Sequence, residues 1–495
     1  MGNSLIRCLL LPIMLFDLAC QPDHKDYEQR EMPPNMLLIV SEDHGPHLSC
    51  YGDTIISTPH LDQIAQEGVL FENAYVAQSV CSPSRSSILT GLYPHQNGQL
   101  GLATQGYHML SDVENIYSLL KEVGYQTGMI GKLHVNPESS FPIDYHPITA
   151  SNFSKKELGR YAAYADTMMR TSEKPFFLMV NLPEAHYPWQ NSVDGYPEDP
   201  ILPEDVTPFA YIGFDNERIR NVTASYYNCL LRLDKCIGEL MEALEHSGKE
   251  ENTLVIYLSD HGDEMARGKF DVYEASTKVP FLVKWPGKIK PGRSSGALIS
   301  SVDIVPTILD VVGLTIPEKV SGKSLIPLFE DTETDFREYL FTEYNCDPIL
   351  YFPRRAVRDH QYKLIYSLLQ DRKNESALAY TENRSEALDG SPTREEIESA
   401  PDSIQEVYSR WINSPEIQLF DLINDPWEFR DLADDTAYVE VKERLLQALK
   451  QWQEATDDPL RDNLKLEQLS QEHDTVYSYG FKDDWEYPRY LYHSQ

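Results

Sequence analysis

Short, largely apolar segments are the feature that most constrains how this chain can fold. Segments of strand length that are apolar nearly throughout are typical of parallel strands buried on both faces of a sheet. They lie at residues 35–40, 127–130, 176–182 and 254–258. Helical patterns separate them, at residues 59–67, 115–123 and 224–246. Strands that alternate with helices over roughly 300 residues predict an α/β domain with a large, mostly parallel sheet between helices.

The region after residue 345 has a different pattern. Its strand-like segments lie at 355–367 and 419–422, and an amphipathic helix is predicted at 440–456. This predicts a smaller C-terminal α+β subdomain at 346–495, beside a larger domain at 34–345. Charged and polar residues with little periodicity fill 370–405, which we interpret as a long, partly irregular insertion. The final forty residues also lack strong periodicity.

The first twenty residues have the composition of an export signal. Arg7 precedes an apolar stretch at residues 8–16 that is too short to span a bilayer. Leu18-Ala19-Cys20 then resembles a bacterial lipoprotein cleavage box, although Asp17 is unusual there. We expect a signal peptide at 1–20, a linker at 21–33 and no transmembrane helix. The protein would be exported to the periplasm, outer membrane or surface of a bacterium, with or without a lipid anchor through Cys20.

The chain is strongly acidic, with a formal net charge of −35. This excludes nucleic acid as a partner, because a phosphate backbone requires a cationic surface. An anionic ligand must therefore be met by a local basic pocket within an acidic surface.

The cysteines do not predict a structural zinc site. Cys50, Cys229, Cys236 and Cys346 lack the CxxC spacing of such sites. Cys229 and Cys236 are seven residues apart in a helical pattern, so they either pack in the core or form a disulfide.

Two acid-containing pairs follow two of the predicted strands. Glu42 and Asp43 follow residues 35–40, and Asp260 and His261 follow residues 254–258. Ligands bind where parallel strands end, so we expect the two pairs to lie together. Carboxylates suit Ca²⁺ or Mg²⁺, and the pairs together predict a site for a hard cation. Either pair alone would more often be a turn or a helix cap.

The most informative motif is Cys81-Ser82-Pro83-Ser84-Arg85-Ser86-Ser87-Ile88-Leu89-Thr90-Gly91. Pro83 suits the first turn of a helix, and residues 85–92 have a helical pattern. Residue 81 would therefore lie at or just before a helix N-terminus, where free backbone N–H groups favour an anion. Arg85, one turn along, can reach the same anion. A cysteine without this context would more often be a small buried apolar residue.

The whole motif resembles the signature of the type I, formylglycine-dependent sulfatases. That resemblance implies an alkaline-phosphatase-like sandwich fold. It also implies that a maturation enzyme converts Cys81 to Cα-formylglycine, whose hydrated aldehyde attacks the sulfur of the substrate. The family's metal is usually calcium, with magnesium as an alternative. Its implied ligands are Glu42, Asp43, Asp260, His261 and the formylglycine at position 81. The usual Asp-Asp pair is replaced here by Glu42-Asp43.

Other basic residues match the family by position. They are Lys132 and His134 in Gly131-Lys132-Leu133-His134, His186 after residues 176–182, and Lys269 in Gly268-Lys269-Phe270. Each alone would more often be a solvated charge or an ordinary polar residue. The resemblance implies that Arg85, Lys132 and Lys269 bind sulfate oxygens. It implies that His134 assists the second hydroxyl, which expels sulfate, and that His186 or Lys269 protonates the leaving group.

The likeness extends from about residue 35 to about residue 460 and is strongest to the N-sulfoglucosamine sulfohydrolases (heparan N-sulfatases). Matching segments include Thr58-Pro59-His60-Leu61-Asp62, His95-Gln96-Asn97-Gly98 and Gln451-Trp452. Ala103 and Tyr107 stand where animal sulfamidases tend to have histidines, although His108 fits. That loop would lie near the substrate. Because bacterial relatives include enzymes that act on algal ulvan, the expected sulfated carbohydrate is algal or a glycosaminoglycan, with N- versus O-sulfate open.

Two functions of other classes remain as alternatives. One is a phosphatase or phosphonate hydrolase of the same fold. The other is a catalytically silent carbohydrate-binding lipoprotein, in which Cys81 would remain unconverted.

Overall fold

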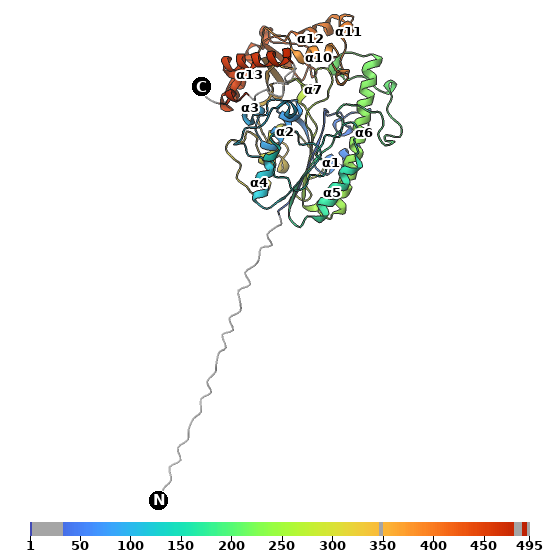
Figure 1. Ribbon diagram of the computed structural model, residues 1–495, viewed down its shortest axis with the longest axis vertical. Helices are drawn as coiled ribbons and strands as arrows, with labels where there is room; N and C mark the ends of the chain where they lie inside the picture. The colour runs from blue at the N-terminus through green and yellow to red at the C-terminus, as the bar shows by residue number, and fades with distance from the viewer. Residues whose placement is uncertain (2–32, 346–349, 480–487, 493–495) are drawn as a thin grey trace. The chain divides into compact units, whose positions relative to one another are not determined.

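A seven-stranded mixed sheet lies at the centre of residues 34–495 in the computed structural model (Figure 1). In spatial order its strands are β3 (Gln126–Ile130), β4 (Phe176–Asn181), β1 (Asn35–Ser41), β5 (Thr253–Ser259), β6 (Phe281–Lys284), β2 (Val69–Tyr75) and β7 (Arg293–Ser300). The first four are parallel, and β6 is antiparallel to both of its neighbours. The structure describes residue 1 and residues 33–345, 350–479 and 488–492.

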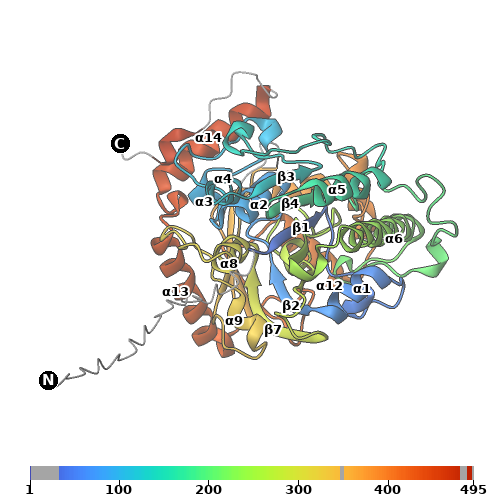
Figure 2. The same ribbon diagram turned by 90° about the horizontal axis from the view of Figure 1, so that it is seen from below.

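Alternating side chains of β1 divide the core into two layers of helices. Leu37 and Ile39 share one core with the first helical layer: α1 (Pro59–Glu67), α5 (Gly159–Thr171) and α6 (Glu217–His246). Leu38 and Val40 share the other with α2 (Cys81–Thr90), α4 (Ile116–Glu122) and α8 (Ile304–Val311). Figure 2 shows α5 and α6 on one side of the sheet and α4 and α8 on the other. The predicted α/β architecture is confirmed.

A smaller antiparallel sheet follows along the chain. Its strands, in spatial order, are β11 (Ile417–Asp421), β10 (Tyr362–Ser367), β9 (Arg354–Arg358) and β8 (Leu340–Tyr344). The helix α13 (Val439–Ala455) covers this sheet, and its Leu445 and Leu449 share a core with Val357 and Leu364. The predicted α+β pattern is confirmed, although the whole of β8 lies before residue 346.

Three segments differ from what the sequence pattern predicts. The helix of the cysteine motif has Cys81 at its N-terminus, as predicted, but it spans Cys81–Thr90 and not 85–92, because the Ser84 amide already donates to the Val80 carbonyl. The insertion at 370–405 contains the short helices α10 (Glu375–Thr381) and α11 (Arg394–Glu398). Within the final forty residues, α14 (Asn463–Tyr479) is helical despite its weak periodicity.

Cys229 and Cys236 are buried and unpaired with each other, so they belong to the core. Within the described ranges, no helix combines the length and the apolar character needed to cross a membrane. The predicted signal peptide at 1–20, the linker at 21–33 and Cys346 fall outside the described residues, apart from Met1 and Pro33.

Candidate active site

The two predicted pairs meet at the carboxyl ends of β1 and β5. These strands are parallel neighbours with Ser41 opposite Ser259, so the residues after each strand leave the sheet side by side. All four are buried: Glu42, Asp43, Asp260 and His261. The Asp43 amide donates to Asp260 Oδ1 at 3.1 Å. Strand register therefore joins residues that are 217 positions apart in the chain.

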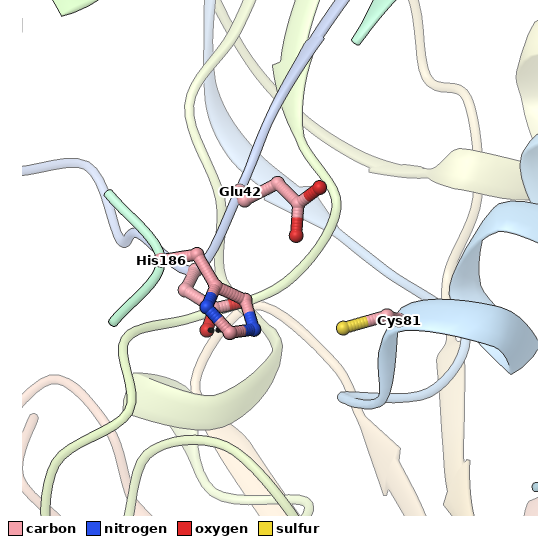
Figure 3. A group of neighbouring side chains, drawn as sticks. Glu42, Cys81 and His186 are labelled. Carbon is pink, nitrogen blue, oxygen red and sulfur yellow. Dashed lines mark ion pairs between the residues drawn. The ribbon is translucent and has the colours of Figure 1, made fainter. Parts of the chain in front are cut away.

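Cys81, the first residue of α2, faces these pairs. Its Sγ lies 3.3 Å from His261 Nε2, and only 3% of the residue is exposed. Figure 3 shows the side chains of Glu42, Cys81 and His186 converging on one space. The Ser84 hydroxyl donates to the Asp260 carbonyl, which ties the first turn of α2 to the end of β5. The free N–H groups of that first turn add a positive end to the site.

The charges around Cys81 favour its thiolate. Burial alone raises the pKa of the thiol, but Lys132, Lys269 and His261 lower it to about 6. Such a shift is typical of an electropositive pocket that accepts an anion.

The acidic cluster has the donor set of a cation site. The ligand atoms of Asp43, Cys81, Asp260 and His261 all lie within 4.8 Å of one another. His261 Nδ1 donates to the Gly262 carbonyl, which leaves Nε2 facing Asp43 Oδ1 at 3.3 Å. Asp43 Oδ1 is buried, and no hydrogen bond reaches it within the described part of the chain. A buried carboxylate oxygen is costly unless it is compensated, so these residues fit a hard divalent cation.

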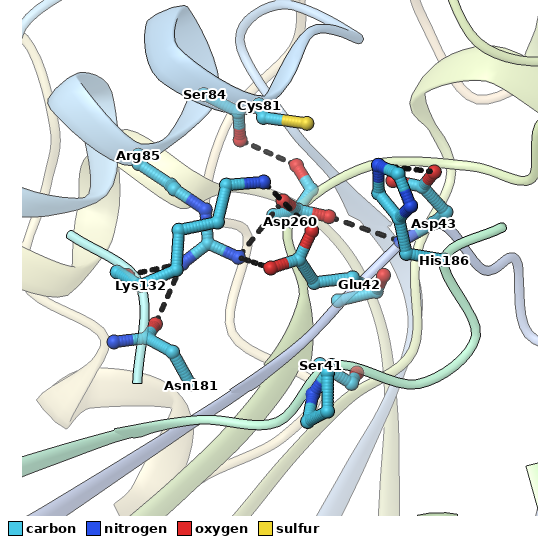
Figure 4. A network of polar contacts seen from close by, with 12 residues as sticks. Ser41, Glu42, Asp43, Cys81, Ser84, Arg85, Lys132, Asn181, His186 and Asp260 are labelled. Atoms are coloured by element: carbon cyan, nitrogen blue, oxygen red, sulfur yellow. Dashed lines mark hydrogen bonds and ion pairs between the residues drawn. The ribbon is translucent and has the colours of Figure 1, made fainter. Parts of the chain in front are cut away.

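Three buried cations surround the acids: Arg85, Lys132 and Lys269. Figure 4 shows Arg85 and Lys132 beside Glu42 and Asp260. Arg85 Nη2 lies 3.1 Å from Glu42 Oε1 and 3.0 Å from Asp260 Oδ2. Lys132 Nζ donates to Glu42 Oε2 at 2.9 Å, and Lys269 Nζ donates to Asp43 Oδ2 at 2.9 Å. Burial would raise the pKa of Asp43, but Lys269 and the neighbouring histidines hold it well below its usual range. The cluster thus combines acidic and basic groups within reach of Cys81.

The two predicted catalytic histidines have different surroundings. His134 follows β3 with a φ of +56°, and burial with the charges of Lys132 and Arg85 lowers its pKa to about 3. It is therefore neutral. His186 Nε2 lies 3.9 Å from Asp43 Oδ2, and burial lowers its pKa. Its Nδ1 donates to the Tyr187 carbonyl at 2.6 Å. His186 also belongs to a second ligand group, with Glu42, Asp43 and Cys81.

Two further residues were not predicted from the sequence. Asn181, the last residue of β4, accepts a hydrogen bond from Arg85 Nη1 at 2.6 Å. Its place at a strand end is the signal that could have identified it. Phe153 stacks on His186 with ring centroids 3.7 Å apart, but it lies in a loop without periodicity. Nothing in the sequence pattern marks it.

The loop that carries Ala103, Tyr107 and His108, predicted to lie near the substrate, contacts the start of α2 through Ala103. The Ala103 amide donates to Ser82 Oγ at 2.9 Å, beside the start of α2. Tyr107 is fully buried, and its hydroxyl contacts His473 in α14 at 3.1 Å. His108 lines a separate cleft of about 1670 Å³ at the other end of α2, where Thr90 lies. No predicted catalytic or metal-binding residue lines that cleft.

Comparison with known sequences gives two family matches. The family described as Sulfatase matches residues 34–314, and N-sulphoglucosamine sulphohydrolase, C-terminal, matches residues 266–385. An ulvan-active sulfatase of Formosa agariphila is 29% identical over 446 residues, which cover 87% of this chain and 82% of that protein. The N-sulphoglucosamine sulphohydrolase of Homo sapiens is 30% identical over 479 residues, with 87% and 92% covered.

Comparison with solved structures gives the fold. A protein in complex with its substrate D-glucosamine-2-N,6-O-disulfate superposes with a TM-score of 0.64 at 21% identity. The match covers 86% of this chain and 98% of that one. At this identity the likeness establishes an alkaline-phosphatase-like fold and leaves the reaction to the site residues.

Proposed function

Because this chain belongs to the sulfatase family, we propose that it hydrolyses sulfate groups on a sulfated polysaccharide or its oligosaccharides. One observation carries the proposal: Cys81 begins a helix and faces a buried cluster of two acid-containing pairs and three cations. The names of the relatives support a carbohydrate substrate, since they include an ulvan-active sulfatase and an N-sulphoglucosamine sulphohydrolase.

The three cations are the proposed ligands of the sulfate oxygens. Sulfuryl transfer places negative charge on the peripheral oxygens of a tetrahedral centre, so fixed positive groups stabilise its transition state. Arg85, Lys132 and Lys269 are all at least 95% buried and are held by carboxylates or Asn181. They therefore need little rearrangement when the substrate arrives.

The proposed cation ligands are Glu42, Asp43, Asp260, His261 and residue 81. Carboxylate oxygens dominate this set, which favours Ca²⁺, with Mg²⁺ as the alternative. When bound, such an ion supplies Lewis-acid polarisation of the sulfate.

Residue 81 is the proposed nucleophile after a maturation enzyme has converted it to formylglycine. A covalent nucleophile divides one difficult displacement into two easier ones. Neutral His134 would accept a proton in the second step. His186 is the better placed proton donor for the leaving group, because 19% of its side chain is exposed and only 4% of that of Lys269.

A Cys81→Ala variant tests the activity directly. The purified wild-type protein, matured in a host with the converting enzyme, should release sulfate from ulvan or heparan oligosaccharides, and the variant should release none. Release at the wild-type rate by Cys81→Ala would contradict the proposal. Release from ulvan would show action on O-sulfate. For heparan oligosaccharides, which carry both kinds of sulfate, structural analysis of the product distinguishes loss of N-sulfate from loss of O-sulfate.

The same preparation separates the alternative functions. Faster turnover of p-nitrophenyl phosphate than of p-nitrophenyl sulfate would favour a phosphatase. Intact mass showing an unconverted Cys81 from a host with the maturation enzyme would favour a silent binding protein.

We further propose export to the periplasm or outer membrane of a bacterium, with Cys20 as the site of lipidation. The composition of the first twenty residues supports this. Mass spectrometry of membrane-associated protein would identify a diacylated Cys20, and cleavage at another residue would contradict lipidation.

A further inference from the structure

A loop at residues 151–157, here named the 151–157 strap, lies directly against His186 of the candidate active site. The Phe153 ring is parallel to the His186 imidazole, with centroids 3.7 Å apart and an interplanar angle of 5°. Lys132 Nζ lies 4.8 Å from the centroid of the same ring. One aromatic side chain therefore contacts two of the residues that surround Cys81.

Lys156 anchors the strap to the segment that carries His186. Its side chain is fully buried, and its Nζ donates to the Pro183 carbonyl at 3.2 Å and the His186 carbonyl at 2.9 Å. It also pairs with Glu184 Oε2 at 3.1 Å, while Arg232 of α6 holds Glu184 Oε1 at 2.6 Å. Because an unpaired buried charge is costly, this arrangement fixes the strap relative to His186.

Further contacts close the strap on itself and on residues 183–190. Asn152 Nδ2 donates to the Lys156 carbonyl at 2.8 Å, and the Lys156 amide donates back to the Asn152 carbonyl at 2.8 Å. Gln190 Nε2 donates to the Ser154 carbonyl at 3.3 Å. The strap and residues 183–190 therefore act as one unit, and Phe153 occupies a defined position in it.

His186 itself has few polar contacts to fix its ring. Its Nδ1 donates to the adjacent Tyr187 carbonyl, and its Nε2 lies 3.9 Å from Asp43, beyond hydrogen-bonding distance. At 19% exposure its side chain is more accessible than those of Lys132 and Lys269, at 5% and 4%. Nε2 is therefore the ring nitrogen that an incoming sugar oxygen can approach. Because the Nδ1 proton is donated to Tyr187, Nε2 carries a proton only when the ring is an imidazolium.

We propose that Phe153 is a positioning residue that holds the His186 imidazole in the orientation needed to protonate the leaving group. The inference rests on the proposed sulfatase function. Stacking restricts rotation of the imidazole, so proton transfer begins from a prepared geometry. Phe153 affects the chemical step and leaves sulfate binding to Arg85, Lys132 and Lys269.

The test compares Phe153→Leu with Phe153→Tyr on an oligosaccharide that the wild-type protein desulfates. Leucine keeps most of the apolar volume but removes the flat ring that stacks on His186. We expect kcat to fall about 10-fold, which is less than the roughly 100- to 10,000-fold rate contribution of a general acid. KM should stay within about 2-fold of wild type, because the interactions that bind the substrate before the reaction are retained. Phe153→Tyr retains the ring and should restore kcat to within about 2-fold of wild type.

Ser154→Ala is the matched control, because Ser154 is exposed on the same strap and only its backbone carbonyl is used. The control should retain wild-type kcat and KM. A loss in Phe153→Leu that lies in KM alone, an unchanged kcat, or a Phe153→Tyr variant as impaired as Phe153→Leu would overturn the inference. If wild type releases sulfate from none of the oligosaccharides, the proposed function fails; an active wild type with an unaffected Phe153→Leu refutes only the role of Phe153.

Discussion

At the scale of single residues, the site is defined by compensation between buried charges. Asp43 has one carboxylate oxygen bound to Lys269 and the other without a hydrogen-bond partner in the described chain. Arg85 is shared between Glu42, Asp260 and Asn181. Asp43 and Arg85 are thus held in place before substrate arrives, which is what electrostatic catalysis requires.

Calcium binding should stabilise the folded protein through Asp43. A ligand that binds only the folded state raises the melting temperature. For this protein we expect a rise of roughly 2–5 °C at saturating Ca²⁺. Thermal unfolding with EDTA, Ca²⁺ or Mg²⁺ measures the shift, which should vanish in Asp43→Asn. The exposed-site control Glu72→Gln should keep it. A calcium shift that survives in Asp43→Asn would place the ion elsewhere.

Asn181→Ala should weaken catalysis without unfolding the protein. The variant removes the acceptor that lies 2.6 Å from Arg85 Nη1 and leaves that buried donor with only the longer contact to the Lys132 carbonyl, at 3.4 Å. We expect kcat/KM to fall about 10-fold, equivalent to about 1.4 kcal/mol, as for the loss of one hydrogen bond to a charged group. Steady-state sulfate release measures it, and a change below 2-fold would show that Glu42 and Asp260 suffice to hold Arg85.

At the scale of elements, buried ion pairs link the two sheets. The helix α7 (Glu274–Thr277) presents Glu274 to Arg358 of β9 at 2.7 Å and to Lys363 of β10 at 3.1 Å. The Tyr75 hydroxyl at the end of β2 donates to the same carboxylate at 2.7 Å. One carboxylate therefore joins the large sheet to the small one.

The stability contributed by Glu274 should depend on pH. Burial raises its pKa, but Arg358 and Lys363 lower it from 4.5 to about 2. A depressed pKa stabilises the fold above pH 4.5, and the effect is lost as pH falls toward 2. Glu274→Gln should cost about 3 kcal/mol at pH 7, with the difference from wild type shrinking below pH 4.5.

Urea unfolding at several pH values measures this difference. The surface pair Glu406–Arg410 supplies the control, because the Glu406 side chain is 72% exposed. Glu406→Gln should change stability by less than about 0.5 kcal/mol at every pH. A constant penalty for Glu274→Gln from pH 7 to pH 3 would argue against the assigned pKa.

Trp452 of α13 should matter for stability far more than for catalysis. The residue is 7% exposed, and its ring lies parallel to that of Phe341 at 5.0 Å and edge-on to that of Tyr93 at 4.9 Å. Trp452→Ala should cost about 3–5 kcal/mol in unfolding free energy. The control Trp427→Ala, at a residue that is 41% exposed, should cost much less. Equal penalties for the two variants would contradict this packing argument.

At the scale of the whole molecule, the acidic surface opposes the proposed substrate. With a net charge of −35, the protein should repel a polyanion until the charges are screened. Raising NaCl from about 10 to about 150 mM should therefore raise kcat/KM for a highly sulfated oligosaccharide several-fold, since the Debye length shortens from about 30 to about 8 Å. p-Nitrophenyl sulfate, with one charge, should respond less. A steady decrease with salt for the oligosaccharide would indicate that local cations dominate the encounter.

How far the sequence predicts this molecule depends on the range of the interactions. The strands and the clustering of Glu42, Asp43, Asp260 and His261 follow from apolar runs and strand ends. The position of Cys81 at a helix N-terminus was predicted, but the helical pattern at 85–92 begins four residues late, because Ser82 to Ser84 are equally typical of a turn. Phe153 could not be predicted, because its role depends on a loop fixed by the distant ion pair of Glu184 and Arg232.

Under the proposed conversion of residue 81, the burial of Cys81 would set an order of events during biosynthesis. With 3% of the residue exposed at the first turn of α2, no second protein can reach Sγ once the helix has packed. Conversion to formylglycine would therefore have to take place on the unfolded chain, and it would compete in time with folding. Conditions that slow folding should raise the converted fraction, and chains that fold first would remain permanently as cysteine.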